Sequence, residues 1–141
     1  MANNQLFIDT GAYLSRFHKH DKWHKKAVET WEDLGEENQI YVTTNHVVDE
    51  VATLLGRRTS YEYAARRLEK IYASDILIAR PDKPDEKEAL IFFRKYADQK
   101  ISFTDCLSFV VMRHLKIKRV FTFDKKHFEY AGFKVILSSL K

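Results

Sequence analysis

The chain has 141 residues, a length that suits one domain with a sizeable hydrophobic core, and we expect residues 1–141 to form a single domain. Its 4 glycines and 2 prolines exclude long flexible linkers, and its longest apolar runs are too short to cross a bilayer. The net charge of +4 is compatible with a polyanionic partner, and the absence of a signal-peptide pattern at the start leads us to expect a cytoplasmic protein.

Short apolar runs alternate with longer segments of helical periodicity along the chain. In chain order we predict a strand at 5–8, a helix opening at Asp9, a helix at 21–38, a strand at 40–43, helices at 45–57 and 60–73, a strand at 75–79, helices at 84–96 and 102–115, and strands at 119–123 and 134–137. The helix at 102–115 is apolar on most sides, so we place it at the centre, with Cys106 as a buried structural thiol. Strands alternating with helices predict an α/β fold whose parallel sheet is covered on both faces.

Four carboxylates stand at positions where this pattern changes. Asp9 and Asp124 follow predicted strands, Glu50 interrupts the apolar stripe of the helix at 45–57, and Asp105 lies at the start of the central helix. Acids that follow parallel strands share one edge of the sheet, where sites form in open α/β folds. Carboxylates gathered there repel one another unless a cation lies between them, so a divalent metal and phosphoryl-ester chemistry are the simplest interpretation.

Each acid also has an ordinary structural explanation. Asp9 could simply cap the following helix, and Glu50 could pair with an arginine or lie at the edge of its stripe. Ser102 and Asp105 match a capping box, and Asp124 could be a turn residue. The order of the four acids along the chain is therefore more informative than any one of them.

Five segments, taken in this order along the chain, resemble the PIN-domain ribonucleases, most closely the VapC-type toxins of prokaryotic toxin–antitoxin pairs. The segments are Phe7–Thr10, Val48–Val51, Ile101–Phe109, Phe121–Phe128 and Ala131–Phe133. The resemblance covers nearly the whole chain, and all four acids are present. It implies a three-layer α/β/α fold with a central parallel sheet of four or five strands. It also implies a Mg²⁺- or Mn²⁺-dependent endoribonuclease, a small antitoxin protein as partner and a homodimer.

Carried over residue by residue, the resemblance makes Asp9 and Asp105 the principal metal ligands, with Glu50 and Asp124 completing the set directly or through water. It makes the same four acids the catalytic residues. Neighbouring hydroxyls are expected to orient a carboxylate or a water molecule, namely those of Thr10, Ser102 and Thr104. Oxygen ligands suit Mg²⁺ or Mn²⁺ better than Zn²⁺.

Basic and aromatic residues outside the acids carry weaker signals. Lys125 and Lys126 adjoin Asp124 and are our candidates for RNA contacts. The segment 18–26 is rich in histidine and lysine, and its pattern favours a solvated basic helix face over a transition-metal site. Trp23 and Trp31 match the helical period, so we expect core or interface positions for them rather than base stacking.

Three other interpretations stay open at this point. A haloacid-dehalogenase phosphatase needs a second aspartate two residues after the first, where this chain has Gly11, and a receiver domain normally has an acidic pair near its first strand. The third is a PIN-like domain that binds RNA or protein without cleaving it. Burying the acids without a metal would be costly, which argues against this third interpretation.

Overall fold

Five parallel strands form a single sheet with the order β3-β2-β1-β4-β5 in the computed structural model, which describes residues 4–138. The strands are β1 (Gln5–Ile8), β2 (Ile40–Thr44), β3 (Leu77–Ala79), β4 (Arg119–Phe121) and β5 (Lys134–Val135). Strand β1 lies in the middle, and three of its four residues are buried. A central parallel strand is covered on both faces, which is why its sequence is an unbroken apolar run.

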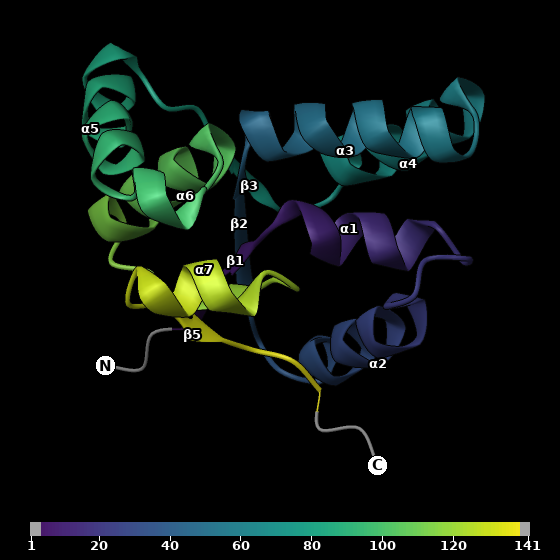
Figure 1. The fold of residues 1–141 in the computed structure, drawn as a ribbon. Helices are drawn as coiled ribbons and strands as arrows, with labels where there is room; N and C mark the ends of the chain where they lie inside the picture. Colours follow the sequence, from purple (N-terminus) through teal and green to yellow (C-terminus); the bar gives the residue numbers. More distant parts are fainter. Residues whose placement is uncertain (1–3, 139–141) are drawn as a thin grey trace.

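Helices cover both faces of the sheet, so the molecule has three layers (Figure 1). The helices α1 (Thr10–Phe17), α2 (His24–Gly35), α3 (Asn45–Arg58) and α4 (Tyr61–Ala73) gather on one face. The opposite face carries α5 (Lys83–Lys95), α6 (Phe103–His114) and α7 (Lys125–Tyr130), with the short 3₁₀ helix η1 (Ala97–Gln99) between α5 and α6. The three-layer fold with a parallel sheet is therefore confirmed.

The strand order creates a switch point between β1 and β4. From β1 the chain moves outward to β2 and then β3 with its helices on one face, and from β3 it returns to β4 with its helices on the other. Right-handed crossovers that leave in opposite directions open a crevice at the carboxyl ends of the two neighbouring strands. Asp9 directly follows β1 and Asp124 lies three residues after β4, so both acids lie at this crevice.

Helix α6 forms the centre of the core, as predicted. Its residues Cys106–Met112 are all buried, and the rings of Phe109 and Phe128 meet edge to face at 5.1 Å. Burial raises the pKa of the Cys106 thiol to about 11, which fits a structural role rather than that of a nucleophile. Within residues 4–138, no helix combines the length and apolar character that crossing a membrane requires.

Several predicted boundaries were wrong, for local reasons. Helix α2 begins at His24 rather than at Asp21, because the Asp21 carboxylate accepts a hydrogen bond from the Trp23 backbone N–H and forms a turn before the helix. Strand β4 ends at Phe121, and a similar turn follows in which the Thr122 hydroxyl accepts from the Asp124 N–H at 2.9 Å. Helix α7 was not predicted, because six residues are too few to show a helical period.

Candidate active site

Asp9 occupies the N-cap position of α1, but its side chain does not cap the helix. Asp9 is only 6% exposed, and the Oδ2 atom of its carboxylate accepts a hydrogen bond of 2.7 Å from the Thr122 hydroxyl. Among the residues described, the buried Oδ1 atom of Asp9 has no hydrogen-bond partner. A buried carboxylate oxygen without a partner costs free energy unless something outside the chain satisfies it. The simple capping explanation is therefore wrong for this side chain.

Glu50 reaches the same place from α3. It is half-buried, and its Oε1 atom accepts a hydrogen bond of 2.5 Å from the hydroxyl of Thr10, the first residue of α1. In the part of the chain that the structure describes, no ion pair joins Glu50 to an arginine or lysine. Thr10 thus makes the contact that an orienting residue needs, and its role stays a prediction, whereas the alternative of an arginine partner for Glu50 is not borne out.

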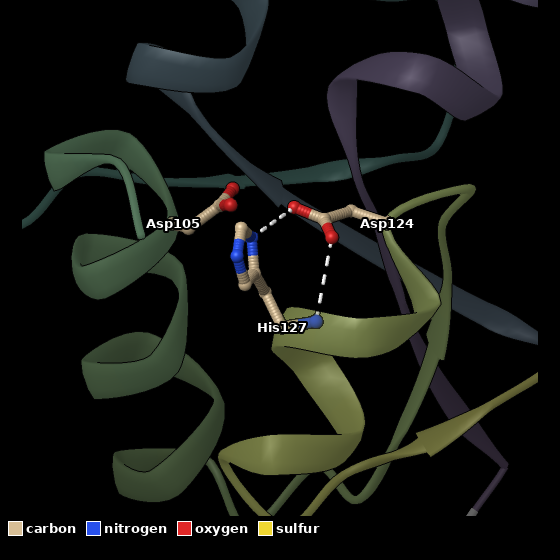
Figure 2. A group of neighbouring side chains, drawn as sticks. All are labelled: Asp105, Asp124 and His127. Atoms are coloured by element: carbon tan, nitrogen blue, oxygen red, sulfur yellow. Dashed lines mark hydrogen bonds and ion pairs between the residues drawn. The ribbon is translucent and has the colours of Figure 1, made fainter. Parts of the chain in front are cut away.

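Asp105 lies at the third position of α6, where a capping box was expected. Only half of that box forms within the described residues: the Ser102 hydroxyl accepts from the Asp105 N–H at 3.1 Å, whereas the Asp105 carboxylate turns toward Asp124 and His127 (Figure 2). Ser102 therefore fixes the first turn of the helix, and the acid remains available to the site.

Asp124 is held by His127, a residue that the sequence analysis did not select. The Asp124 carboxylate caps α7 by accepting from the His127 N–H at 3.3 Å, and its other oxygen lies 2.7 Å from His127 Nδ1 (Figure 2). The second ring nitrogen, Nε2, lies 3.0 Å from the Gln99 carbonyl oxygen. A histidine three residues after an N-cap aspartate is the signal that could have revealed this pair.

The four carboxylates act on one another electrostatically. Burial is the largest effect and raises the pKa of Asp9 from 3.8 to about 6, with smaller contributions from Glu50 and Asp124. Burial also raises the pKa of Asp105 to about 9, assisted by the charges of Asp9, Asp124 and Glu50. The charged forms of Asp9 and Asp105 are disfavoured chiefly because these carboxyls are removed from water, and the neighbouring negative charges add to the effect. A divalent cation would reverse this balance.

The donor atoms fit a hard divalent cation. Single ligand atoms of Asp105, Asp124 and His127 all lie within 4.8 Å of one another. Asp9 and Glu50 are not members of this group of ligand atoms and act on Asp105 through their charge. Most of these donors are carboxylate oxygens, which Mg²⁺ and Mn²⁺ prefer. Both nitrogens of His127 already face protein oxygens, so its contacts suit a residue that positions Asp124.

The remaining predicted residues have mixed outcomes. In residues 4–138 the hydroxyls of Ser102 and Thr104 donate to none of the four acids, whereas Thr122, which was not selected, does. Lys125 and Lys126 are exposed beside the site, and their role in RNA contact stays a prediction.

The segment 18–26 does not form the continuous helix face that was expected. Its residues up to Trp23 precede α2, and the ring of His24 contacts the Ser15 carbonyl oxygen through Nδ1 at 2.8 Å. Across the described residues the only cluster of potential metal ligands is the one at the sheet edge.

The two tryptophans have different environments. Trp31 packs among Tyr13, Tyr41 and Phe121 and donates a hydrogen bond from Nε1 to the Ala12 carbonyl oxygen at 3.0 Å, as a core position requires. Trp23 is 41% exposed, so of the two expected positions the core is wrong for it, and an interface position stays a prediction.

A model of the PIN domain matches residues 6–134, which include all four acids. The chain belongs to the PIN domain family. This membership decides against the phosphatase and receiver interpretations. It also agrees with the fold, because Asp9 and Asp124 follow the neighbouring parallel strands β1 and β4 and so share the sheet edge that the sequence predicted for them.

Known PIN-domain proteins extend the comparison. The chain is 27% identical over 128 residues to the 23S rRNA-specific endonuclease VapC20 of Mycobacterium tuberculosis, covering 91% of this chain and 95% of that protein. The crystal structure of VapC20, described as a toxin that cleaves the sarcin–ricin loop, superposes with a TM-score of 0.85 over 94% of this chain and 99% of that one. VapBC2 from Rickettsia felis, crystallised with a DNA fragment from its promoter, has a TM-score of 0.69 at 14% identity and covers 94% and 97%. This last likeness concerns the fold alone.

Proposed function

We propose that this PIN-domain protein is a metal-dependent endoribonuclease that hydrolyses phosphodiester bonds in RNA. The observation that carries the proposal is the convergence of Asp9, Glu50, Asp105 and Asp124 at the switch point, with the pKa of Asp105 raised to about 9 and one oxygen of Asp9 buried without a partner in residues 4–138. An acidic cluster of this kind is unfavourable alone and becomes favourable around a cation. The likeness to VapC20 supports the same chemistry.

The ion we propose is Mg²⁺ or Mn²⁺. Asp9 and Asp105 would hold it as principal ligands, and Glu50 and Asp124 would contribute directly or through water. When bound, such an ion supplies an acidified water molecule and offsets the charge that develops on the phosphate.

The chain's own contacts determine how the acids are presented. The Thr10 hydroxyl orients Glu50, the Thr122 hydroxyl orients Asp9, and His127 orients Asp124. Each contact fixes a carboxylate rotamer before RNA arrives, so less reorganisation is needed during the reaction. In-line attack by water opposite the 3′ oxygen would form a new P–O bond and break the P–O3′ bond, with the proton passing to the leaving 3′ oxygen. The products would be a 5′-phosphate and a 3′-hydroxyl, which are the ends that the resemblance implies.

We further propose that the protein acts as the toxin of a toxin–antitoxin pair and that a small antitoxin neutralises it. The support is the likeness to VapC20, which is a 23S rRNA-specific endonuclease and a toxin that cleaves the sarcin–ricin loop. We propose ribosomal RNA as the first substrate to test, a homodimer as the assembly, and the cytoplasm as the location. Lys125 and Lys126, exposed next to Asp124, are proposed to contact the RNA backbone.

The test is cleavage of end-labelled ribosomal and total RNA by purified protein with Mg²⁺, with Mn²⁺ and with a chelator, alongside Asp105→Asn. Asparagine keeps the shape of the side chain and removes its charge. Asp49→Asn, which changes an exposed acid beside Glu50, is the matched control. We expect metal-dependent cuts with wild type and Asp49→Asn, and none with Asp105→Asn. RNA binding without cleavage under all metal conditions would favour the non-catalytic alternative.

A further inference from the structure

Trp23 is an exposed aromatic residue that the nuclease mechanism has not used. It lies just before α2 and is 41% exposed, and its ring stacks on Phe123 with centroids 5.4 Å apart and planes inclined by 12°. The pair therefore presents a rigid flat surface that is partly open to solvent. Exposed aromatic faces are the usual platforms for unpaired nucleobases.

The stack adjoins the acidic cluster through Phe123. This residue lies between Thr122, whose hydroxyl holds Asp9, and Asp124. Its ring also packs against the start of α1, where a Cβ atom placed on Gly11 would lie 3.6 Å from Phe123 Cδ2. The aromatic surface is thus attached to the two segments that carry Asp9 and Asp124.

The backbone that carries Trp23 is held in place by a small polar network. The Asp21 carboxylate accepts hydrogen bonds from the Trp23 N–H at 2.8 Å and from the Ser15 hydroxyl at 3.0 Å, and Arg58 lies 4.0 Å from its other oxygen. These contacts tie the turn to α1 and α3. A platform fixed before binding loses little conformational entropy when a ligand stacks on it.

The side chain of Lys22 places a positive charge beside the Trp23–Phe123 stack. The Lys22 ammonium lies over the Trp23 ring, 5.4 Å from its centroid, while Phe123 is stacked on this ring as well. A base that stacks on Trp23 would therefore displace the ammonium from the ring toward the adjoining phosphate. The neighbouring lysines of this segment are Lys19, Lys25 and Lys26. An aromatic face for the base and an ammonium for the phosphate form the usual pair of contacts to single-stranded nucleic acid.

We propose that Trp23, backed by Phe123, stacks an unpaired base of the RNA next to the scissile phosphate, and that Lys22 contacts the backbone of the same strand. The proposal rests on the proposed nuclease function and adds to it a base-stacking position formed by Trp23 and Phe123. Trp23 would be a specificity-determining residue that touches substrate and takes no part in the chemical step.

The experiment compares Trp23→Ala and Trp23→Phe with Tyr72→Ala, a control that removes an aromatic side chain 55% exposed on α4. We expect Trp23→Ala to raise KM for RNA about tenfold to a hundredfold with little change in kcat, because a stacked base is worth about that factor in affinity. Trp23→Phe keeps a flat ring and is expected to restore most of the loss. Tyr72→Ala should cleave like wild type.

A second measurement does not depend on cleavage. In the Asp105→Asn background, a single-stranded hexauridylate is titrated with Mg²⁺ present, and tryptophan fluorescence is followed. Stacking on Trp23 should quench the emission, and the quench should vanish in Trp23→Phe, which retains only Trp31.

The outcomes separate the two proposals. If wild type cleaves RNA but Trp23→Ala keeps KM within about twofold of it, or the quench persists in Trp23→Phe, the stacking proposal is overturned and the nuclease stands. A loss of kcat in Trp23→Ala that Trp23→Phe does not rescue would indicate a structural role and also overturn it. If wild type neither cleaves nor binds RNA with either metal, both proposals fail.

Discussion

Replacing Asp105 with asparagine is expected to stabilise the metal-free protein. Burial, with help from Asp9 and Asp124, raises the pKa of the Asp105 carboxyl from 3.8 to about 9. At pH 7 the folded protein therefore keeps this carboxyl protonated, whereas the unfolded chain releases the proton. Each pKa unit corresponds to about 1.4 kcal/mol, so the roughly three units between 3.8 and pH 7 cost on the order of 4 kcal/mol of unfolding free energy.

The effect has a definite pH dependence. Because the folded-state pKa of Asp105 lies above the unfolded one, the associated stability is fully present below pH 3.8 and is lost as the pH rises toward 9. The raised pKa of Asp9 also lowers the free energy of unfolding as the pH rises to about 6. Because Asp9 and Asp105 repel each other, their contributions to this free energy are not additive. Wild type and Asp105→Asn should therefore converge below about pH 4 and separate steadily above it.

The assay is urea and thermal unfolding in chelator from pH 4 to pH 9. At pH 7 we expect Asp105→Asn to gain about 2 to 4 kcal/mol, or about 10 °C in Tm, and the exposed-acid control Asp49→Asn to stay close to wild type. Millimolar Mn²⁺ should raise the Tm of wild type but not that of Asp105→Asn. An Asp105→Asn protein that is no more stable than Asp49→Asn at any pH would refute the reasoning.

Three further predictions concern the residues around the acids. His127→Gln is expected to weaken Mn²⁺ binding by about tenfold in titration calorimetry, because it removes the ring nitrogen that holds the Asp124 carboxylate. An unchanged affinity would argue against a positioning role for His127. Thr122→Val removes the hydroxyl that lowers the pKa of Asp9, so carbon-detected NMR should show this carboxyl titrating above pH 6, and a lower value would contradict the geometry. Replacing both Lys125 and Lys126 with glutamine should reduce the slope of log Kd for RNA against log salt by about one or two, whereas an unchanged slope would remove them from the interface.

The sequence by itself was sufficient for the architecture, because its strongest signals are local and periodic. The unbroken apolar run at 5–8 predicted a buried parallel strand, and the all-round apolar helix at 102–115 predicted the core helix. Asp9 and Asp124 indicated a shared site, because acids that follow parallel strands lie at one edge of the sheet. Glu50 and Asp105 were joined to them by the order of the four acids, which resembles that of the PIN-domain ribonucleases. Their individual roles as ligands stay predictions.

Only the tertiary structure decided which neighbouring side chains form hydrogen bonds with those acids. Thr122 and His127 carry no periodic signal, and their importance arises from contacts to Asp9 and Asp124 that the folding of β4 and α7 creates. The environment of Trp23 was likewise undecidable from spacing, because the Asp21 turn removes it from the helix and exposes its ring. Periodicity reports which face of an element is apolar, whereas hydrogen bonds across elements depend on how the chain is packed.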